Sequence, residues 1–244
     1  RVPSRGHPRG GYFRAAIRPV GTATAHQGPH SVDWARDGRL WVTNALGNEI
    51  MALDPATDRT QHWSLPRGGY YPHTHRVIGD TVWFTVALSD HLGRLDLRKN
   101  TIDLVALPRS NWEQRVAMGL LGVAFGLSSR RPGTDAHLDY AFGRMTGHGA
   151  RAMPLPYGLG VAPDGSVWYG KLYDDRIGRY DPRTGEVKEW RTPFSGPRRL
   201  GIDRGGIVWI AGFASGVLAR FDPRRERFKV YPVPAVPTGA EMPY

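Results

Sequence analysis

The chain has 244 residues, of which 40% are hydrophobic, and it contains no cysteine. This length is ample for one hydrophobic core, and the lack of cysteine excludes disulfides, thiolate metal sites and cysteine nucleophiles. The formal net charge is +11, carried mostly by arginines scattered through turns among acidic residues. Nucleic-acid binders need a basic stripe with stacking aromatic residues, which is absent from the sequence, so we expect no nucleic-acid partner.

A phrase of about 42 residues repeats four times along the chain. Its most regular mark is a tryptophan between apolar residues, and the intervals between successive tryptophans are 42, 85 and 41 residues: Trp41, Trp83, Trp168 and Trp209. Self-similarity at this period is typical of β-propellers, whose four-stranded sheets surround a central channel. The sequence therefore predicts an all-β propeller of antiparallel blades, at about 26–66, 69–108, 154–193 and 196–234.

Each predicted blade has the same internal order. A proline-containing turn leads into an apolar strand, and a tight turn such as Asp37-Gly38 or Asp164-Gly165 follows. Asp-Gly between apolar runs is a strong signal for a β-hairpin. The tryptophan strand comes next, and two further strands complete the blade. We interpret the tryptophans as wedges that fill the space between neighbouring blades.

The double interval between the second and third tryptophans is predicted to be an insertion, 109–153, rather than a fifth blade. Ser110 and Glu113 have the spacing of a capping box. Behind them, apolar residues recur at helical spacing and predict an amphipathic helix near 110–128: Trp112, Val116, Leu120, Val123, Ala124 and Leu127. The run is too short to span a membrane. Three interpretations of this helix stay open. It packs over one rim of the propeller, it closes the channel as a lid, or it contacts a membrane surface.

The end of the chain resembles the opening phrase of another blade, at 240–244. We therefore expect 1–244 to be a single propeller domain that is a fragment of a longer array. Closed propellers have four to eight blades. An unclosed array exposes a sheet edge, and an exposed edge favours self-association.

Equivalent positions of the repeat are expected to converge at one mouth of the channel. The residue after the repeated proline differs between blades, and it forms a predicted ring: His30, His73, Tyr157, Arg198 and Tyr244. Because imidazole titrates near neutral pH, His30 and His73 are the candidate catalytic base and acid. The alternative is that these histidines only make hydrogen bonds in the channel.

A second predicted ring follows the tryptophan strand: Asn44, Val86, Lys171 and Gly212. A small anionic or carbonyl-bearing ligand in the channel would meet cationic and hydroxyl groups. The candidate substrate-binding residues are His75, Tyr157, Lys171, Arg198, Arg199 and Tyr244. The alternative is ordinary polarity at the rim.

Several phrases resemble the virginiamycin B lyase (streptogramin lyase) family of propellers. They lie at 28–32, 37–43 and 175–190, and the likeness covers about 26–108 and 154–244. NHL and gluconolactonase-type propellers share the phrase in weaker form. The resemblance implies a seven-bladed fold and a magnesium-assisted elimination that opens the ester bond of a cyclic depsipeptide. A histidine then acts as the base while Mg²⁺ polarises the carbonyl.

One residue of the family pattern is missing. In the family, a metal-binding glutamate follows a channel histidine by fourteen residues, just after the tryptophan strand. Here that place holds Asn44 in the first blade and Val86, Lys171 and Gly212 in the others. The ligands of the Mg²⁺ that the resemblance implies therefore stay unassigned.

These observations leave three functional hypotheses. The first is a lyase-like enzyme that acts on a small cyclic or ester-bearing molecule bound in the channel. The second is a non-catalytic propeller that binds a ligand or a protein at the same mouth. The third, a lactonase-like hydrolase, needs a calcium-binding carboxylate cluster that the sequence does not display. The resemblance implies a bacterial protein, and a cysteine-free chain is compatible with an extracytoplasmic compartment.

Overall fold

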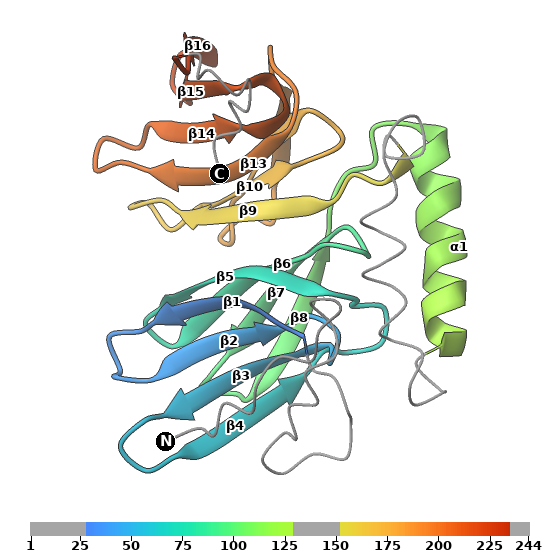
Figure 1. Cartoon of the computed structure of the whole chain (residues 1–244), viewed down its shortest axis with the longest axis vertical. Helices are drawn as coiled ribbons and strands as arrows, with labels where there is room; N and C mark the ends of the chain where they lie inside the picture. Colours follow the sequence, from blue (N-terminus) through green and yellow to red (C-terminus); the bar gives the residue numbers. More distant parts are fainter. Residues whose placement is uncertain (1–27, 129–151, 235–244) are drawn as a thin grey trace, which may run out of the picture.

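The computed structural model describes residues 28–128 and 152–234. These residues form four antiparallel four-stranded sheets, each a meander in chain order, stacked side by side (Figure 1). The first sheet contains β1 (Pro29–Trp34), β2 (Leu40–Asn44), β3 (Glu49–Asp54) and β4 (Arg59–Ser64). The second contains β5 (Pro72–Ile78), β6 (Thr81–Val86), β7 (His91–Asp96) and β8 (Thr101–Ala106).

The other two sheets follow the insertion. The third contains β9 (Pro156–Val161), β10 (Val167–Lys171), β11 (Arg176–Tyr180) and β12 (Val187–Arg191). The fourth contains β13 (Pro197–Ile202), β14 (Val208–Gly212), β15 (Val217–Asp222) and β16 (Arg227–Pro232). One α-helix, α1 (Trp112–Ser128), and a short 3-10 helix (Phe213–Ser215) complete the described elements. The predicted all-β class, with four-stranded antiparallel sheets and a helical insertion, is confirmed.

The tight turns between the first two strands of a sheet are held by their own aspartates. Asp37 Oδ1 accepts a hydrogen bond from the Arg39 amide at 2.9 Å, and Asp203 Oδ1 does the same for Gly205 at 2.9 Å. The second oxygen of Asp203 accepts from the Trp209 indole at 3.1 Å. The turn that the sequence signalled therefore also orients the tryptophan of the following strand.

Three of the repeated tryptophans are buried between neighbouring sheets, as we interpreted them. Trp41 packs on residues of the second sheet, Trp83 on the third and Trp168 on the fourth. The second sheet thus packs directly on the third, although 49 residues separate the end of β8 from the start of β9. Trp209 is half-buried, on the face of the fourth sheet that has no neighbouring sheet among the described residues.

Each inner strand carries a β-bulge next to its proline. The pairing slips between Pro29 and Ser31 in β1, between Pro72 and His75 in β5, and between Pro197 and Arg199 in β13. The pairing of β9 with β10 has a corresponding slip. A bulge leaves residues without a ladder partner and redirects their side chains. The residues of the predicted ring fall in these bulges.

A threonine hydroxyl links each of the first two sheets to the next. Thr43 Oγ1 accepts the Ser31 amide at 3.0 Å within its own sheet and donates to the His73 carbonyl at 2.6 Å. Thr85 Oγ1 accepts the Thr74 amide at 3.1 Å and donates to the Tyr157 carbonyl at 3.0 Å. These buried hydroxyls therefore fix the distance between successive inner strands at the bulge.

The third sheet has a glycine at the corresponding position. A Cβ on Gly170 would lie 2.7 Å from the Pro197 carbonyl oxygen, so the two backbones approach too closely for a side chain. Direct contact between the two backbones therefore takes the place of the hydroxyl link between the third and fourth sheets.

The start of α1 differs from the predicted capping box by one residue. Asn111 Oδ1 accepts the Gln114 amide at 2.8 Å, and Gln114 Oε1 accepts the Ser110 amide at 2.9 Å. Asn111 is therefore the N-cap and Gln114 takes the place predicted for Glu113. The physical reason is that Ser110 is engaged elsewhere, because its hydroxyl donates to Asp174 at 2.7 Å.

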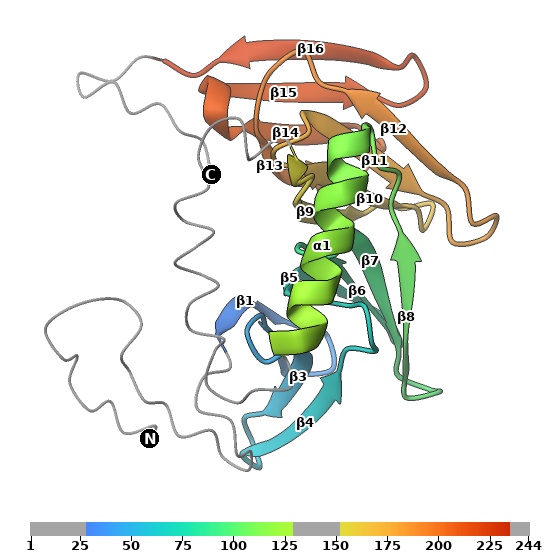
Figure 2. The same ribbon diagram turned by 90° about the vertical axis from the view of Figure 1, so that its right-hand side faces the viewer.

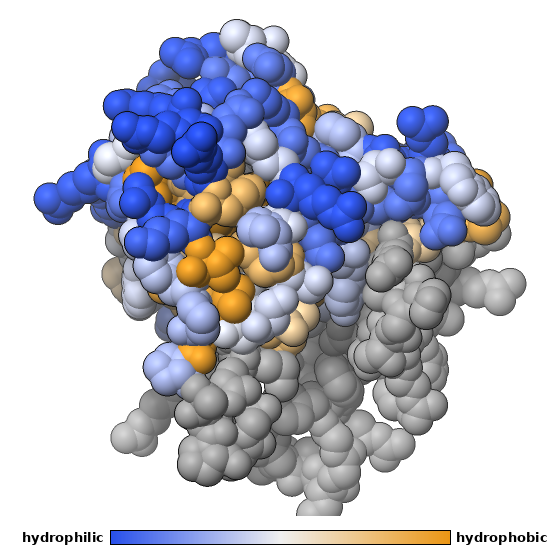
Figure 3. All heavy atoms as spheres, turned by 90° about the horizontal axis from the view of Figure 1, so that it is seen from above, coloured by the Kyte–Doolittle hydropathy of each residue, from blue (hydrophilic) through white to orange (hydrophobic). Residues whose placement is uncertain are grey.

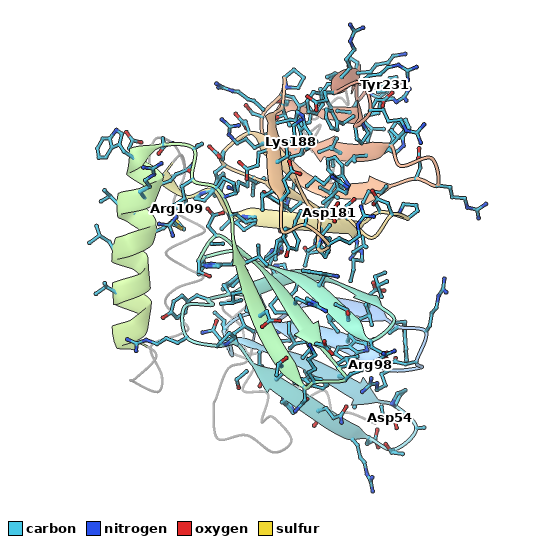
Figure 4. The ribbon with its side chains drawn as sticks, turned by 180° about the vertical axis from the view of Figure 1, so that it is seen from behind. Asp54, Arg98, Arg109, Asp181, Lys188 and Tyr231 are labelled. Carbon is cyan, nitrogen blue, oxygen red and sulfur yellow. The ribbon has the colours of Figure 1, made fainter. Side chains whose placement is uncertain are left out.

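Helix α1 lies against one edge of the sheets (Figure 2), and its predicted apolar side faces away from them (Figure 4). The side chains that touch the propeller are Gln114 and Met118, and Met118 packs with Leu88 and Met153. The exposed residues are those of the predicted apolar face: Trp112, Val116, Leu120 and Val123. In the described part of the chain, no helix has the length and hydropathy needed to cross a membrane.

The two outermost sheets each present an uncovered face among the described residues. Val32 and Trp34 on β1 are exposed, and so are Leu218 and Val230 on the fourth sheet. Figure 3 views the molecule from the fourth sheet and shows a mostly hydrophilic surface with smaller hydrophobic areas. The described residues therefore form an open array of four sheets.

The threonine link predicts a specific stability loss. Thr85→Val should lower the free energy of unfolding by about 1–3 kcal/mol, because it leaves the buried Thr74 amide and Tyr157 carbonyl without their shared partner. Urea unfolding measures this loss. The control is Thr101→Val, which makes the same chemical change at an exposed position of β8. Equal losses in the two variants would contradict the role of the link.

Candidate functional site

The ring predicted from the repeat places three aromatic side chains in contact. The His73 ring centroid lies 3.8 Å from that of His30 and 3.8 Å from that of Tyr157. His73 is 2% exposed, whereas His30 is exposed. Tyr71, the residue before the second repeated proline, lies 6.3 Å from both imidazoles. The bulges of three inner strands thus bring residues from three sheets to one place.

Two arginines from the fourth sheet join this group. Arg198 Nη2 donates to the Tyr157 hydroxyl at 2.9 Å, and its guanidinium carbon lies 4.2 Å from the Phe213 ring centroid. Arg199 Nη1 donates to Thr74 Oγ1 at 3.1 Å, and the same oxygen lies 3.1 Å from His73 Nδ1. Thr74 therefore connects a guanidinium to the central imidazole. We call His30, His73, Tyr157, Arg198 and Arg199 the mouth cluster.

The surroundings of His73 disfavour its charged form. Burial is the largest cause and lowers the pKa of His73 well below 6.5, and the nearby His30, Arg199 and Arg198 lower it further. A hydrogen bond with the Tyr157 backbone opposes this effect. The imidazole is consequently neutral at neutral pH. The two guanidinium groups beside it can stabilise negative charge that develops on a ligand oxygen.

His75 lies on the same strand but not in the mouth cluster. Its side chain is fully buried, and neither ring nitrogen has a hydrogen-bond partner in the described chain. Burial lowers the pKa of His75 to about 4; Asp33 opposes this shift and Arg76 adds to it. The structure therefore gives no direct support to the predicted contact between His75 and a substrate.

Lys171 also lies away from the mouth cluster. The side chain is fully buried, with Nζ 2.8 Å from Glu189 Oε1 and 3.5 Å from Asp90 Oδ1, and it donates to the Pro108 carbonyl. Burial raises the pKa of Asp90 to about 7; Lys171 opposes this shift and Glu189 adds to it. Lys171 thus neutralises acids between the second and third sheets, and this placement gives no direct support to the predicted contact with a substrate.

The rest of the predicted second ring is likewise buried. Asn44 and Val86 are the last residues of β2 and β6, and Gly212 is the last residue of β14. Asn44 Nδ2 donates to Glu49 Oε1 at 2.7 Å within its own sheet. Their burial gives no direct support to the predicted second ring. Tyr244, the last residue of the predicted first ring, lies outside the described residues.

Sequence reasoning missed the residues that hold the mouth cluster in place. Thr43 and Thr85 fix the backbone of His73 and Tyr157, and Thr74 orients Arg199. A signal was present, because threonine stands two residues after the tryptophan in the first two repeats. Phe213, which covers the Arg198 guanidinium, had no counterpart in the other repeats.

The donors of the mouth cluster do not fit Mg²⁺. This cation prefers oxygen ligands, usually carboxylates and water, whereas the cluster offers two imidazoles, a phenol and two guanidinium groups. Among residues 28–128 and 152–234, no group of three histidine, cysteine or acidic side chains could hold a metal. The resemblance-derived Mg²⁺ therefore takes no part in the chemistry that we derive from these residues.

The comparisons with known proteins bear on the fold. No protein-family model and no curated protein matches the chain. A solved streptogramin B lyase is 18% identical, with a TM-score of 0.66 over 89% of this chain and 59% of its own. A catalytically inactive virginiamycin B lyase from Staphylococcus aureus with quinupristin is 18% identical, with a TM-score of 0.63 over 86% and 57%.

A third similar structure is part of a protein complex. A chain of a nidogen/laminin complex is 9% identical, with a TM-score of 0.55 over 84% of this chain and 63% of its own. The chain therefore spans less than two thirds of each of these proteins. At such low identity the likeness shows the fold: the chain has the all-β propeller architecture that virginiamycin B lyase and related propellers share.

The buried imidazoles predict how stability depends on pH. The unfolded chain binds a proton at His75 near pH 6.5, whereas the folded chain binds it near pH 4. As pH falls through this window the unfolded state gains the proton first, so His75 lowers the free energy of unfolding by about 1.4 kcal/mol per pH unit. His75→Phe removes this share, and urea unfolding at several pH values measures it.

The comparison of variant with wild type isolates His75. His73 contributes with the same sign, and Asp90 with the opposite sign because its pKa is raised in the folded state. Both residues are present in both proteins, so their contributions cancel in the difference. Identical pH slopes for wild type and His75→Phe would contradict a buried neutral His75.

Proposed function

We propose that the mouth cluster is the active site of a lyase-like propeller enzyme that opens an ester bond in a small cyclic molecule. The single observation that supports this function best is the placement of the His73 imidazole. It lies between the His30 and Tyr157 rings and shares Thr74 with the Arg199 guanidinium. A neutral base beside a fixed cation suits the removal of a proton next to a carbonyl group.

The proposed step uses the residues of this chain. His73 takes the proton from the carbon next to a carbonyl. The electrons of that C–H bond form a double bond to the neighbouring carbon. The bond between this neighbouring carbon and the ester oxygen breaks. The ester oxygen leaves as a carboxylate, so no water is consumed. The guanidinium groups of Arg198 and Arg199 stabilise the negative charge on the carbonyl and carboxylate oxygens. His73 then releases its proton to water, which restores the neutral base, and His30 is the candidate acid that gives a proton to the carboxylate.

A streptogramin lyase is among the proteins of similar fold, which supports this reaction by analogy. A magnesium-assisted variant of the reaction would need a carboxylate ligand outside the mouth cluster. In our proposal the two arginines provide the positive charge that the metal would otherwise supply. The activity of the whole protein is part of the same proposal, because the chain spans only about three fifths of that lyase.

A binding propeller without catalysis is the second candidate. It is favoured by the close packing of the mouth cluster, in which His73 is almost fully buried between two rings. Such an arrangement leaves Arg198 and Arg199 as the groups that recognise a ligand, with the imidazole as their support. The two candidates differ in turnover and in the effect of His73.

The test uses quinupristin, which accompanies the inactive virginiamycin B lyase in its crystal structure, as the probe. We expect ring opening without a change in mass, because elimination adds no water. His73→Gln should lower the rate by about 10²–10⁴-fold, the usual contribution of a general base. The control is His62→Gln, because His62 is exposed on an outer strand. Mass spectrometry and absorbance of the new double bond follow the reaction.

Each other outcome excludes the proposed enzyme for this probe. Ring opening with the gain of one water would identify a hydrolase. Turnover that survives His73→Gln would exclude His73 as the base. Binding without turnover, weakened by Arg198→Ala and not by His73→Gln, would establish the binding propeller.

A further inference from the structure

The outer side of α1 carries a continuous row of exposed apolar side chains. Trp112, Val116, Leu120 and Val123 are 71%, 52%, 67% and 63% exposed. Their spacing of four, four and three residues places them along one side of the helix. We call these four residues the apolar row. Such a row is costly to leave in water, and exposed apolar surface of this kind marks a site of interaction.

The orientation of the helix is fixed by its opposite side. Gln114 is fully buried, and its Nε2 donates to Asp174 Oδ1 at 2.9 Å. Met118 is buried against Leu88 and Met153. The helix therefore cannot turn its apolar row toward the sheets without giving up these contacts. Figure 4 shows side chains that project from α1 away from the propeller.

The shape of this surface suits a flat, soft partner rather than a groove. α1 stands at one side of the described sheets in Figure 1 and in front of them in Figure 2. The apolar row runs along a single convex helix. Tryptophan at one end of the row is typical of side chains that lie at a membrane interface.

The charge of the chain favours an anionic surface. Arg115 is exposed on the helix beside Val116, and Arg109 precedes the helix (Figure 4). Glu113 is the one acidic residue between Trp112 and Ser128. The whole chain has a net charge of +11. Two copies of the chain would repel each other, whereas a surface of anionic lipid headgroups would attract the chain.

We propose that α1 docks the protein on an anionic membrane surface, with the apolar row in the interface and the sheets on the aqueous side. An apolar helix face and basic residues together provide the two contributions, hydrophobic and electrostatic, that peripheral binding requires. This docking is independent of the proposed function. The membrane is contacted and not crossed.

The docking also orients the mouth cluster. Met118 on the inner side of α1 packs in the same cluster as Tyr70, Tyr71 and Leu155. Tyr71 in turn lies 6.3 Å from the His30 and His73 rings. The helix is therefore fastened at the edge of the mouth, and docking places the mouth close to the lipid surface.

The experiment is sedimentation with lipid vesicles. Wild type should bind vesicles of equal parts phosphatidylglycerol and phosphatidylcholine, and bind pure phosphatidylcholine vesicles more weakly. Val116→Ser with Leu120→Ser should reduce the bound fraction on the order of tenfold or more, because two apolar side chains leave the interface. The control is Val32→Ser, which removes a similarly exposed side chain from β1. Arg115→Glu should weaken binding to the anionic vesicles alone.

The outcomes separate the membrane from other occupants. A melting temperature equal to that of wild type shows that the double variant is folded, as expected for exposed positions. The proposal would be overturned if wild type bound neither kind of vesicle, or if wild type and the double variant bound equally well. It would also be overturned if the row mediated self-association, seen as a wild-type dimer in solution that the double variant lacks.

Discussion

A buried threonine hydroxyl between two inner strands is the interaction on which the arrangement of the site depends. Thr43 and Thr85 each hold the bulge of their own sheet and the backbone carbonyl of the next inner strand. Sheets that are wedged apart by tryptophans could slide along each other, since hydrophobic contact is not directional. The hydrogen bonds of the threonine hydroxyl are directional and therefore fix the position of one sheet relative to the next. Because the residues that it holds are His73 and Tyr157, the same bond that spaces the sheets also sets the two rings against each other.

The buried charges between the second and third sheets differ from the charges of the mouth cluster. Between the second and third sheets, Lys171 meets Asp90 and Glu189 in a fully buried group, so opposite charges compensate there. At the mouth, Arg198 and Arg199 stand beside imidazoles, and the described cluster has no acidic member. Burial, and after it the neighbouring cations, lower the pKa of His73, and the two arginines leave the mouth cluster positive. This positive charge favours a ligand that is anionic or carries a carbonyl group.

The sequence predicted the fold well because the repeat displays it four times. Aligning the repeats also identified the ring position, and the structure brings His30, His73, Tyr157 and Arg198 together there. Lys171 was misplaced because the repeat gives a position along a strand and not the face. Side chains alternate along β10, and Lys171 falls on the face of Tyr169, toward the second sheet. The sequence left the orientation of α1 open for a similar reason: helical spacing defines an apolar side, whereas Gln114 and Met118 determine which side is buried.

The central claim is that His73 is a neutral imidazole at the centre of the mouth cluster. Nitrogen-detected magnetic resonance of protein with labelled histidine reports the protonation of each ring as a function of pH. Our account predicts that His73 stays neutral well below the ordinary imidazole pKa of about 6.5, and that His73→Gln identifies its signal by removing it. A His73 that takes up its proton at or above that value would contradict the account, because the candidate base would then be charged at neutral pH.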